Sequence, residues 1–336
     1  MHEKTHRQAT LHDVARLANV SHQTVSRVIN NSPNVADETR VRVLAAINEL
    51  HYRPNRAARS LITGSSQTIQ VVIFEETYLT PIPAIVSEAN GLGYRVGLSV
   101  LPHEHTPEEM RELFDDLTSR LVDGFLLFDP QENFESDEIR LLCRGIPFVQ
   151  MGGDPVEKIP AVLIDHEAGM RQVMDHLLGL GHRKIAEISG PERVFDARVR
   201  HRVYLEKMRV AGLEPGPSCE GDFGADTAYH HALDLLQGGA EFSAIVCAND
   251  ESALGVLRAL HECGLRVPED VSVTGFDDHP PVRFYEPPLT TVRQDYAEMS
   301  RVGIKFLVDL IAEPDLVLPQ KILEPQLIIR ESTRAI

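Results

Sequence analysis

A short polar segment near the N-terminus carries side chains that could pair with the edges of DNA bases. The polar residues are, in order, His22, Gln23, Ser26, Arg27 and Asn30. Glutamine can hydrogen-bond adenine bidentately, and arginine can do the same with guanine, when they enter a major groove. Val25, Val28 and Ile29 alternate with the polar residues at helical spacing. The pattern therefore predicts a helix with one buried face and one polar face.

Two further helices are needed to position this segment. An earlier apolar stripe, Leu11, Val14, Ala15 and Ala18, predicts a helix capped by Thr10 with Asp13 three residues on. Ser21 is the expected N-cap of the second helix. A third helix is expected over residues 37–50, burying Val43, Leu44, Ile47 and Leu50. Two short helices separated by a few residues, with small alanines where they cross, are typical of a helix-turn-helix whose second helix reads DNA.

The alternative for this segment is a solvated polar face on an ordinary small helical bundle, and the charge distribution argues against it. The chain of 336 residues has a formal net charge of -17, yet residues 1–64 hold nine Lys and Arg against five Asp and Glu. The remainder holds 24 against 45. We call residues 1–64 the basic head and the remainder the acidic body. The charges indicate that the basic head is attracted to phosphate and that non-specific DNA repels the acidic body.

The acidic body alternates short apolar runs with amphipathic stretches. Strands are expected at 69–74, 95–101, 124–128, 148–151, 161–164, 184–188, 244–248 and 271–275, and a final strand at 321–330. Helices are expected at 108–120, 166–180, 197–211, 225–237 and 251–263. Alternating β and α elements predict α/β architecture with doubly wound parallel sheets. Their number exceeds one such fold, so two lobes are expected, with a ligand at the carboxyl ends of the strands.

Other chemistries find little support. His103 and His105 point oppositely in an extended loop with no third ligand in view, so we expect no metal. The glycines at 91 and 93 follow a helix, which is the wrong context for a dinucleotide loop. Neighbouring acids beside His182 and His201 come without a nucleophile, and the four cysteines are scattered in apolar context. We therefore expect no catalytic site, no cofactor and no disulfide framework.

The stretch VARLANVSHQTVSRVINNSPNVADETRVRVLAAINELHYRPNRAARSL resembles the DNA-binding domain of the lactose-repressor (LacI/GalR) family of bacterial regulators. The resemblance implies base contacts from His22, Gln23 and Arg27, and a minor-groove wedge at Leu61 on a hinge helix at 55–62. It implies phosphate contacts from Thr10, Ser21, Thr24, Asn30 and Asn55. Ala36 departs from the Ser or Thr usual at the third helix's cap, which should cost about 1 kcal/mol, partly offset by Asp37 and Glu38.

The body is similar to the same family over IDHEAGMRQVMDHLLGLGHRKIAEISGP, CANDESALGVLRALHECGLRVPEDVSVTGFDD and EPPLTTVRQDYAEM. This implies a fold like that of periplasmic sugar-binding proteins, with three strands crossing between the lobes. The implied effector contacts are Arg198, Phe223, Asn249, Asp277, Gln294 and Tyr296. Carboxylate, amide and guanidinium groups suit sugar hydroxyls, and Phe223 suits the C–H face. Singly, Asn249 could instead cap a helix, Asp277 sit in a turn and Arg198 pair at the surface.

The expected organisation is a helix-turn-helix domain at 1–54, a hinge at 55–66 and a two-lobed effector-binding and dimerisation domain at 67–336. The expected protein is a cytoplasmic homodimer that represses carbohydrate-utilisation genes from a palindromic operator and is released by a small sugar. The alternative effectors are a non-sugar metabolite or a corepressor that strengthens binding. With no membrane segment or export signal and no C-terminal heptads, we expect neither a transport-type binding protein nor a tetramer. A doubly wound enzyme would explain the strands only.

Overall fold

The computed structural model describes residues 9–29, 32–53, 64–74, 80–101, 106–128 and 136–336. The chain divides into two units, residues 1–66 and 67–336. None of the helices within the described ranges is long and apolar enough to cross a membrane.

The first unit contains three helices, α1 (Leu11–Leu17), α2 (His22–Ile29) and α3 (Asp37–Glu49). The predicted cap of α1 is confirmed: the Asp13 backbone N–H donates to the Thr10 hydroxyl at 3.3 Å, and the Thr10 N–H donates to the Asp13 carboxylate at 2.9 Å. The shared core consists of Val14, Ala15, Ala18, Val25, Val28, Val43, Ala46 and Tyr52. The helix-turn-helix expected from the spacing is therefore present.

One core residue of α3 was predicted wrongly. Leu44 is 47% exposed, whereas Ala46 is buried and Ile47 packs against the core. Residues 43, 46, 47 and 50 recur at the i, i+3, i+4 and i+7 spacing of one helical face, and Leu44 lies one residue round from that face. Ala36 makes no side-chain cap, as expected, and Asp37 and Glu38 occupy the first turn.

The second unit contains two lobes, the first built on a six-stranded parallel sheet in the order β11-β5-β4-β3-β1-β2. Its strands are β1 (Thr68–Ile73), β2 (Arg95–Val100), β3 (Gly124–Phe128), β4 (Phe148–Met151), β5 (Ala161–Ile164) and β11 (Gln320–Leu323). One face packs on α5 (Ile82–Gly91) and α12 (Tyr296–Ala312), and the other on α6 (Pro107–Ser119) and α7 (Ser136–Cys143). Helices on both faces make this a doubly wound lobe.

The second lobe is built on a four-stranded parallel sheet in the order β7-β6-β8-β9. Its strands are β6 (Ile185–Ser189), β7 (Ser218–Glu220), β8 (Ala244–Cys247) and β9 (Ser272–Thr274). Helices α8 (His166–Gly179) and α9 (Phe195–Val210) cover one face, and α10 (Ala225–Gln237) and α11 (Asp250–Glu262) cover the other. A 3₁₀ turn, η1 (Pro280–Phe284), follows β9. The predicted α/β class with two lobes is confirmed.

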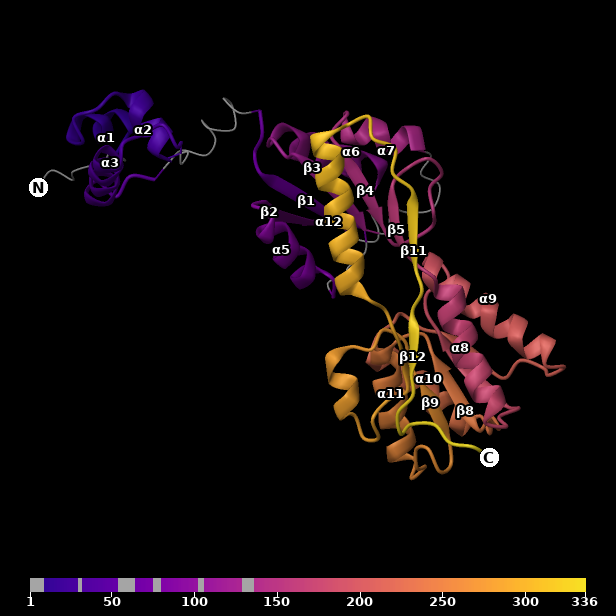
Figure 1. The fold of residues 1–336 in the computed structure, drawn as a ribbon. Helices are drawn as coiled ribbons and strands as arrows, with labels where there is room; N and C mark the ends of the chain where they lie inside the picture. Colours follow the sequence, from indigo (N-terminus) through magenta and orange to yellow (C-terminus); the bar gives the residue numbers. More distant parts are fainter. Residues whose placement is uncertain (1–8, 30–31, 54–63, 75–79, 102–105, 129–135) are drawn as a thin grey trace, which may run out of the picture. The chain divides into compact units, whose positions relative to one another are not determined.

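The chain passes between the lobes three times: from β5 to α8, from β10 (Thr291–Arg293) to α12, and from β11 to β12 (Gln326–Ile328) (Figure 1). The single strand expected at 321–330 is therefore wrong. β11 pairs with β5 in the first lobe, whereas β12 pairs antiparallel with β10. Pro325 lies between them and has no N–H to continue a ladder, so one apolar run is divided between two sheets.

Candidate functional site

The polar face of α2 is open to solvent. His22, Gln23 and Arg27 are exposed, while Val25 and Val28 are buried on the opposite face. The His22 ring lies 5.4 Å from that of His12 on α1. The three side chains expected to read bases are thus all exposed. His22 and Gln23 lie in the first turn of the second helix, where a recognition helix meets base edges, and Arg27 lies in its last turn.

The hydroxyl residues of the same unit lie at helix starts. The Ser21 Oγ accepts the Thr24 backbone N–H at 3.1 Å and lies 2.9 Å from the Thr24 hydroxyl. Thr10 caps α1. Helix N-termini present free N–H groups and a positive dipole end, which suits phosphate. Asn30, Asn55, Leu61 and the predicted hinge helix at 55–62 lie outside the described residues.

A second set of polar residues gathers in the second lobe, where several chain segments follow a strand. Asp277 comes after β9 and Gln294 after β10, and the Gln294 amide donates to the Asp277 carboxylate. Burial raises the pKa of Asp277, while Arg200, His279 and the Gln294 hydrogen bond act to lower that pKa. The Asp277 backbone has a φ of 119°, a strained conformation for a residue with a side chain. These two expected residues are brought together.

Asn249 and Phe223 join the set from β8 and β7. The Asn249 Nδ2 donates to the Phe223 carbonyl at 3.0 Å, and the Asn249 Oδ1 accepts the Ser252 backbone N–H at 2.8 Å. Asn249 is therefore the N-cap of α11, the alternative role that the sequence left open, as well as the tether of Phe223. The buried Phe223 has a φ of 68°, and the Arg200 guanidinium lies over its ring.

Tyr296 begins α12, immediately after the second crossing between lobes. Its hydroxyl pKa is raised well above the usual value, mainly by burial and then by the charge of Asp277, with Arg200 acting to lower it. Tyr296 also packs against the apolar core of the first lobe. This side chain links the lobe-2 cluster to lobe 1.

Arg198 does not lie with the other five expected effector residues. Its guanidinium donates to the Glu192 carbonyl at 2.9 Å and lies 5.9 Å from the Phe195 ring. The guanidinium within the cluster is that of Arg200, which is buried and lies 4.6 Å from the Phe276 ring and 5.6 Å from that of Phe223. Ala197, Arg200 and Tyr204 recur on the buried face of α9, and this periodicity was the signal that could have identified Arg200.

Two further buried residues were missed. The His166 Nε2 lies 2.9 Å from the Asp196 carboxylate, and both side chains are almost fully buried. The His166 ring stacks on Phe276 at 5.7 Å, and the Asp196 carbonyl accepts a hydrogen bond from Arg200 at 3.2 Å. His166 follows the first lobe crossing directly. No motif marks this pair, because its members are 30 residues apart and meet only in the folded lobe.

Asp250 completes the buried polar groups. Its carboxylate accepts the His279 backbone N–H at 2.8 Å and the Thr291 hydroxyl at 2.5 Å. Burial, followed by the charge of Asp277, raises the Asp250 pKa well above its usual value. These partners attach the β9 loop and β10 to the start of α11, which holds the strand ends of the cluster in place.

This arrangement defines a class of protein. A helix-turn-helix unit with an exposed polar reading face is joined to a two-lobed α/β unit whose buried polar cluster lies at the carboxyl ends of strands and at the lobe crossings, which is where such folds hold small ligands. Among the described residues no group of three or more His, Cys, Asp or Glu could hold a metal ion. The class is a ligand-responsive DNA-binding regulator.

Comparison with known proteins gives the family. A model of the bacterial regulatory proteins of the lacI family matches residues 10–55, and one of periplasmic binding protein-like domains matches residues 174–333. The lactose operon repressor of Escherichia coli (strain K12) is 33% identical over 329 residues, covering 97% of this chain and 91% of the relative. The repressor PurR of Haemophilus influenzae (strain ATCC 51907) is 36% identical over 338 residues, covering 98% and 99%.

Solved structures agree. The crystal structure of the lac repressor dimer bound to operator and the anti-inducer ONPF matches with a TM-score of 0.88 at 32% identity, over 98% of this chain and 100% of that chain. The complex of the regulator CelR with cellobiose matches with a TM-score of 0.71 at 33% identity, over 96% and 99%. The chain belongs to the lacI family. It is a DNA-binding transcriptional repressor and not an enzyme, as its sequence predicted.

Proposed function

We propose that the protein represses genes of carbohydrate use by binding a palindromic operator, and that a small sugar releases it. The observation that carries the effector part is the lobe-2 cluster. Its carboxylate and amide groups follow strands β8, β9 and β10, its guanidinium comes from α9, and its aromatic ring, Phe223, follows β7. Such donors and acceptors suit sugar hydroxyls, and the ring suits a C–H face. CelR in complex with cellobiose, a disaccharide, shares this fold.

In this proposal the sugar contacts Phe223, Asn249, Asp277, Gln294 and Tyr296. Arg200 takes the role that the sequence assigned to Arg198, because its guanidinium lies against the rings of Phe223 and Phe276. Because Asp277 is bonded to Gln294 at one lobe crossing and its charge acts on Tyr296 at the start of α12, a bound sugar favours one arrangement of the lobes. Operator affinity then falls by the sugar's differential affinity for that arrangement.

On DNA, His22, Gln23 and Arg27 read bases in the major groove, and Thr10, Ser21 and Thr24 contact phosphates. Asn30, Asn55 and Leu61 complete the proposed interface, the last as a minor-groove wedge. One short recognition helix reads few bases, so two copies related by a dyad are needed.

A homodimer also fits exposed apolar side chains of the second unit. Phe284 of η1 is 76% exposed and Leu254 of α11 is 43% exposed. Leu254 lies on α11, on the side of the lobe-2 sheet that carries α10 and α11, and Phe284 lies in the turn beside it. Burying such side chains against a second copy is favourable, and the similar lac repressor structure is a dimer.

The test is an operator gel shift combined with a sugar panel. A palindromic operator is first selected from random DNA with the full-length protein, and sugars are then screened by thermal shift, since a ligand at 100 times its Kd adds about 2.7 kcal/mol. We expect a sugar that stabilises the protein to release the operator, and Asp277→Asn to lose both responses while still binding the operator without sugar. A stabilising compound that is not a sugar, or one that strengthens operator binding, contradicts the proposal.

A further inference from the structure

His166 is a buried histidine whose two ring nitrogens are in different situations. Its side chain is 5% exposed, and its Nε2 lies 2.9 Å from the Asp196 carboxylate. An ionised carboxylate only accepts hydrogen bonds, so the Nε2 carries the hydrogen of this pair. The buried Nδ1 has no hydrogen-bond partner among the residues that the structure describes. A polar atom buried in this way bears the full cost of its desolvation, and a ligand that bonds it offsets that cost.

The His166 ring lies among the residues of the proposed effector site. His166 begins α8, directly after the chain first crosses between the lobes. Its ring stacks on Phe276 with the centroids 5.7 Å apart, and the Arg200 guanidinium lies 4.6 Å from the centroid of the same Phe276 ring. His166 is also one of the groups whose charge acts to lower the pKa of Asp277. The ring is therefore close to both the cation and the carboxylate of the lobe-2 cluster.

Asp196 fixes the orientation of this ring and of the neighbouring guanidinium. Its carboxylate lies against the His166 Nε2, and its backbone carbonyl accepts the Arg200 Nε–H at 3.2 Å. A second carbonyl, that of Ala248, accepts the Arg200 Nη1 hydrogen at 2.8 Å. Two donors of Arg200 are thus already bonded to the protein, whereas the His166 Nδ1 keeps its hydrogen-bonding capacity.

The chemistry of an imidazole nitrogen indicates which ligand group suits this position. The Nδ1 accepts a hydrogen bond when the ring is neutral and donates one when the ring is protonated. A hydroxyl group donates and accepts, so it bonds Nδ1 in either state. An ammonium group bonds only the neutral ring, an ether oxygen bonds only the protonated ring, and a methyl group bonds neither. A ligand hydroxyl is therefore the best complement.

We propose that His166 is an effector-binding residue, whose Nδ1 hydrogen-bonds one hydroxyl group of the sugar while Asp196 positions the ring. This inference rests on the proposed function, because it assigns one more contact to the same site. It also makes His166 a determinant of specificity. A buried group that bonds a ligand hydroxyl rejects an analogue without that hydroxyl, because the group is then left without a partner.

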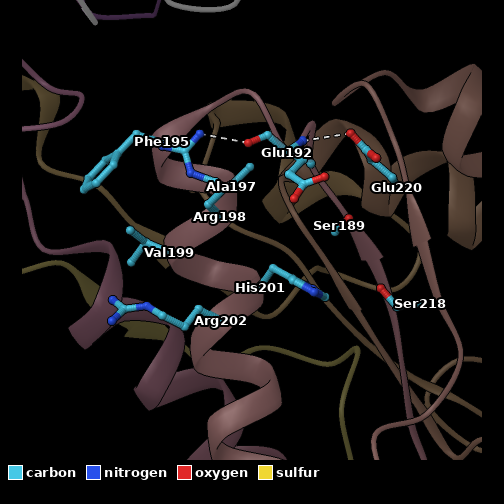
Figure 2. Close-up of a pocket in the computed structure, with 11 residues that line it drawn as sticks. Ser189, Glu192, Phe195, Ala197, Arg198, Val199, His201, Arg202, Ser218 and Glu220 are labelled. Carbon is cyan, nitrogen blue, oxygen red and sulfur yellow. Dashed lines mark hydrogen bonds between the residues drawn. The ribbon is translucent and has the colours of Figure 1, made fainter. Parts of the chain in front are cut away.

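His201 provides a matched control on a neighbouring helix. It lies on α9 in a groove of about 840 Å³ that Arg198 and Glu220 also line (Figure 2). The His201 Nδ1 lies 2.7 Å from the Glu187 carboxylate and is already bonded. His201→Gln therefore removes an imidazole from the second lobe without removing a nitrogen that we assign to the sugar.

Calorimetric titration of the full-length protein measures the inferred bond. The probes are glucose, galactose, ribose, cellobiose and lactose, followed by the monodeoxy derivatives of the sugar that binds most tightly. We expect one derivative to bind about tenfold or more weakly than its parent sugar. His166→Gln, whose amide can still bond Asp196, should bind the parent about tenfold more weakly, and this derivative within about threefold of the parent. His201→Gln should behave as the unsubstituted protein does.

A crystal structure of the unsubstituted protein with the parent sugar tests the bond without a substitution. We expect a hydroxyl oxygen of the sugar within about 3.2 Å of the His166 Nδ1. This measurement decides the matter if His166→Gln does not fold. A sugar bound with no hydroxyl at Nδ1 overturns the inference.

Two titration results overturn the inference and leave the proposed function standing. In the first, His166→Gln binds the parent sugar as tightly as the unsubstituted protein does, while Asp277→Asn does not bind it. In the second, every monodeoxy derivative loses the same factor in His166→Gln as in the unsubstituted protein. Absence of binding by all five sugars at about 10 mM overturns both the inference and the proposed function.

Discussion

The exposed polar surface of α2, which we propose reads DNA, and the buried lobe-2 cluster use the same kinds of side chain in opposite environments. His22 and Arg27 are exposed, whereas His166, Arg200 and Gln294 are 5%, 6% and 7% exposed. The exposed polar groups keep their hydrogen-bonding capacity available for a highly charged partner such as DNA, whose phosphates supply a strong electrostatic field. The buried groups are bonded to one another in one geometry, which suits the proposed selective binding of a small ligand.

The difference arises from how each surface is built. The α2 face is a single helix, so its polar residues are neighbours in the chain. The cluster collects residues from β7, β8, β9, β10 and two lobe crossings. A helix face can change one residue at a time without disturbing its core, while a change in the cluster disturbs several bonded groups at once.

Ionic strength should produce the largest contrast between the two regions. Raising salt from about 50 to 200 mM should weaken operator binding by roughly a thousandfold, because phosphate contacts release condensed counterions. Sugar binding to the buried cluster should change by less than about threefold, since buried groups are little screened. Filter binding and calorimetry measure the two. A flat salt response of operator binding contradicts the role assigned to the basic head.

Arg200→Ala should give the next largest effect. Removing the guanidinium takes away the largest of the effects that lower the pKa of buried Asp277, and deletes the group lying over the Phe276 ring. We expect sugar affinity to fall by roughly a hundredfold, whereas Arg198→Ala should change it by less than about threefold. Calorimetry with the sugar from the panel decides between the two arginines. Arg200→Lys, which keeps the charge, controls for folding. If Arg198→Ala lowers sugar affinity more than Arg200→Ala does, Arg200 is not part of the sugar site.

Arg27→Ala tests the exposed surface. Losing a bidentate base contact should cost about 1 to 3 kcal/mol of operator affinity and relax specificity at one base pair in each half-site. Stability should be unaffected, because Arg27 lies on the exposed face of α2. Operator selection with the variant measures the preference, with Arg16→Ala on α1 as an exposed control. An unchanged preference at every position shows that Arg27 does not read a base.

Ala36→Ser should stabilise the first unit. The α3 N-terminus has no side-chain cap, so a hydroxyl at position 36 gains a hydrogen bond to the first turn and about 1 kcal/mol. Thermal unfolding of the full-length protein measures the gain in stability, and hydrogen exchange of the α3 backbone amides shows whether the gain lies in that helix. Ala45→Ser, in the exposed middle of the same helix, is the control and should be neutral or slightly destabilising. Equal effects at both positions rule out capping as the cause.

The smallest effect is expected from the pH response of His201. Its pKa is raised in the folded lobe by Glu187, so its contribution to stability is fully present below the unfolded value of about 6.5 and is lost as the pH rises through the folded value. The imidazole is 40% exposed, and the contribution should stay below about 1 kcal/mol. His201→Gln should therefore lower unfolding stability more at pH 6 than at pH 8.5. A larger loss of stability at pH 8.5 than at pH 6 contradicts a stabilising hydrogen bond between His201 and Glu187.

Local patterns in the sequence determined much of the molecule. The spacing of apolar residues predicted α1, α2 and the β/α order, and each expected strand before β10 lies within one residue of its observed bounds. The polar face of α2 followed from the same spacing. These features depend on neighbours three or four residues away, or two in a strand, and so are written into short stretches of chain. Leu44 was misplaced because apolar character alone does not say which helical face is inward.

Only the tertiary structure decided the composition of the cluster and the end of the chain. Arg198 and Arg200 are two residues apart in the sequence, yet the Arg198 guanidinium donates to the Glu192 carbonyl whereas that of Arg200 lies over the Phe276 ring. His166 meets Asp196 through the packing of α8 on α9. The run at 321–330 divides because its halves pair with strands in different lobes. Such contacts join residues far apart in the chain, and their geometry exists only once the sheets and helices have packed.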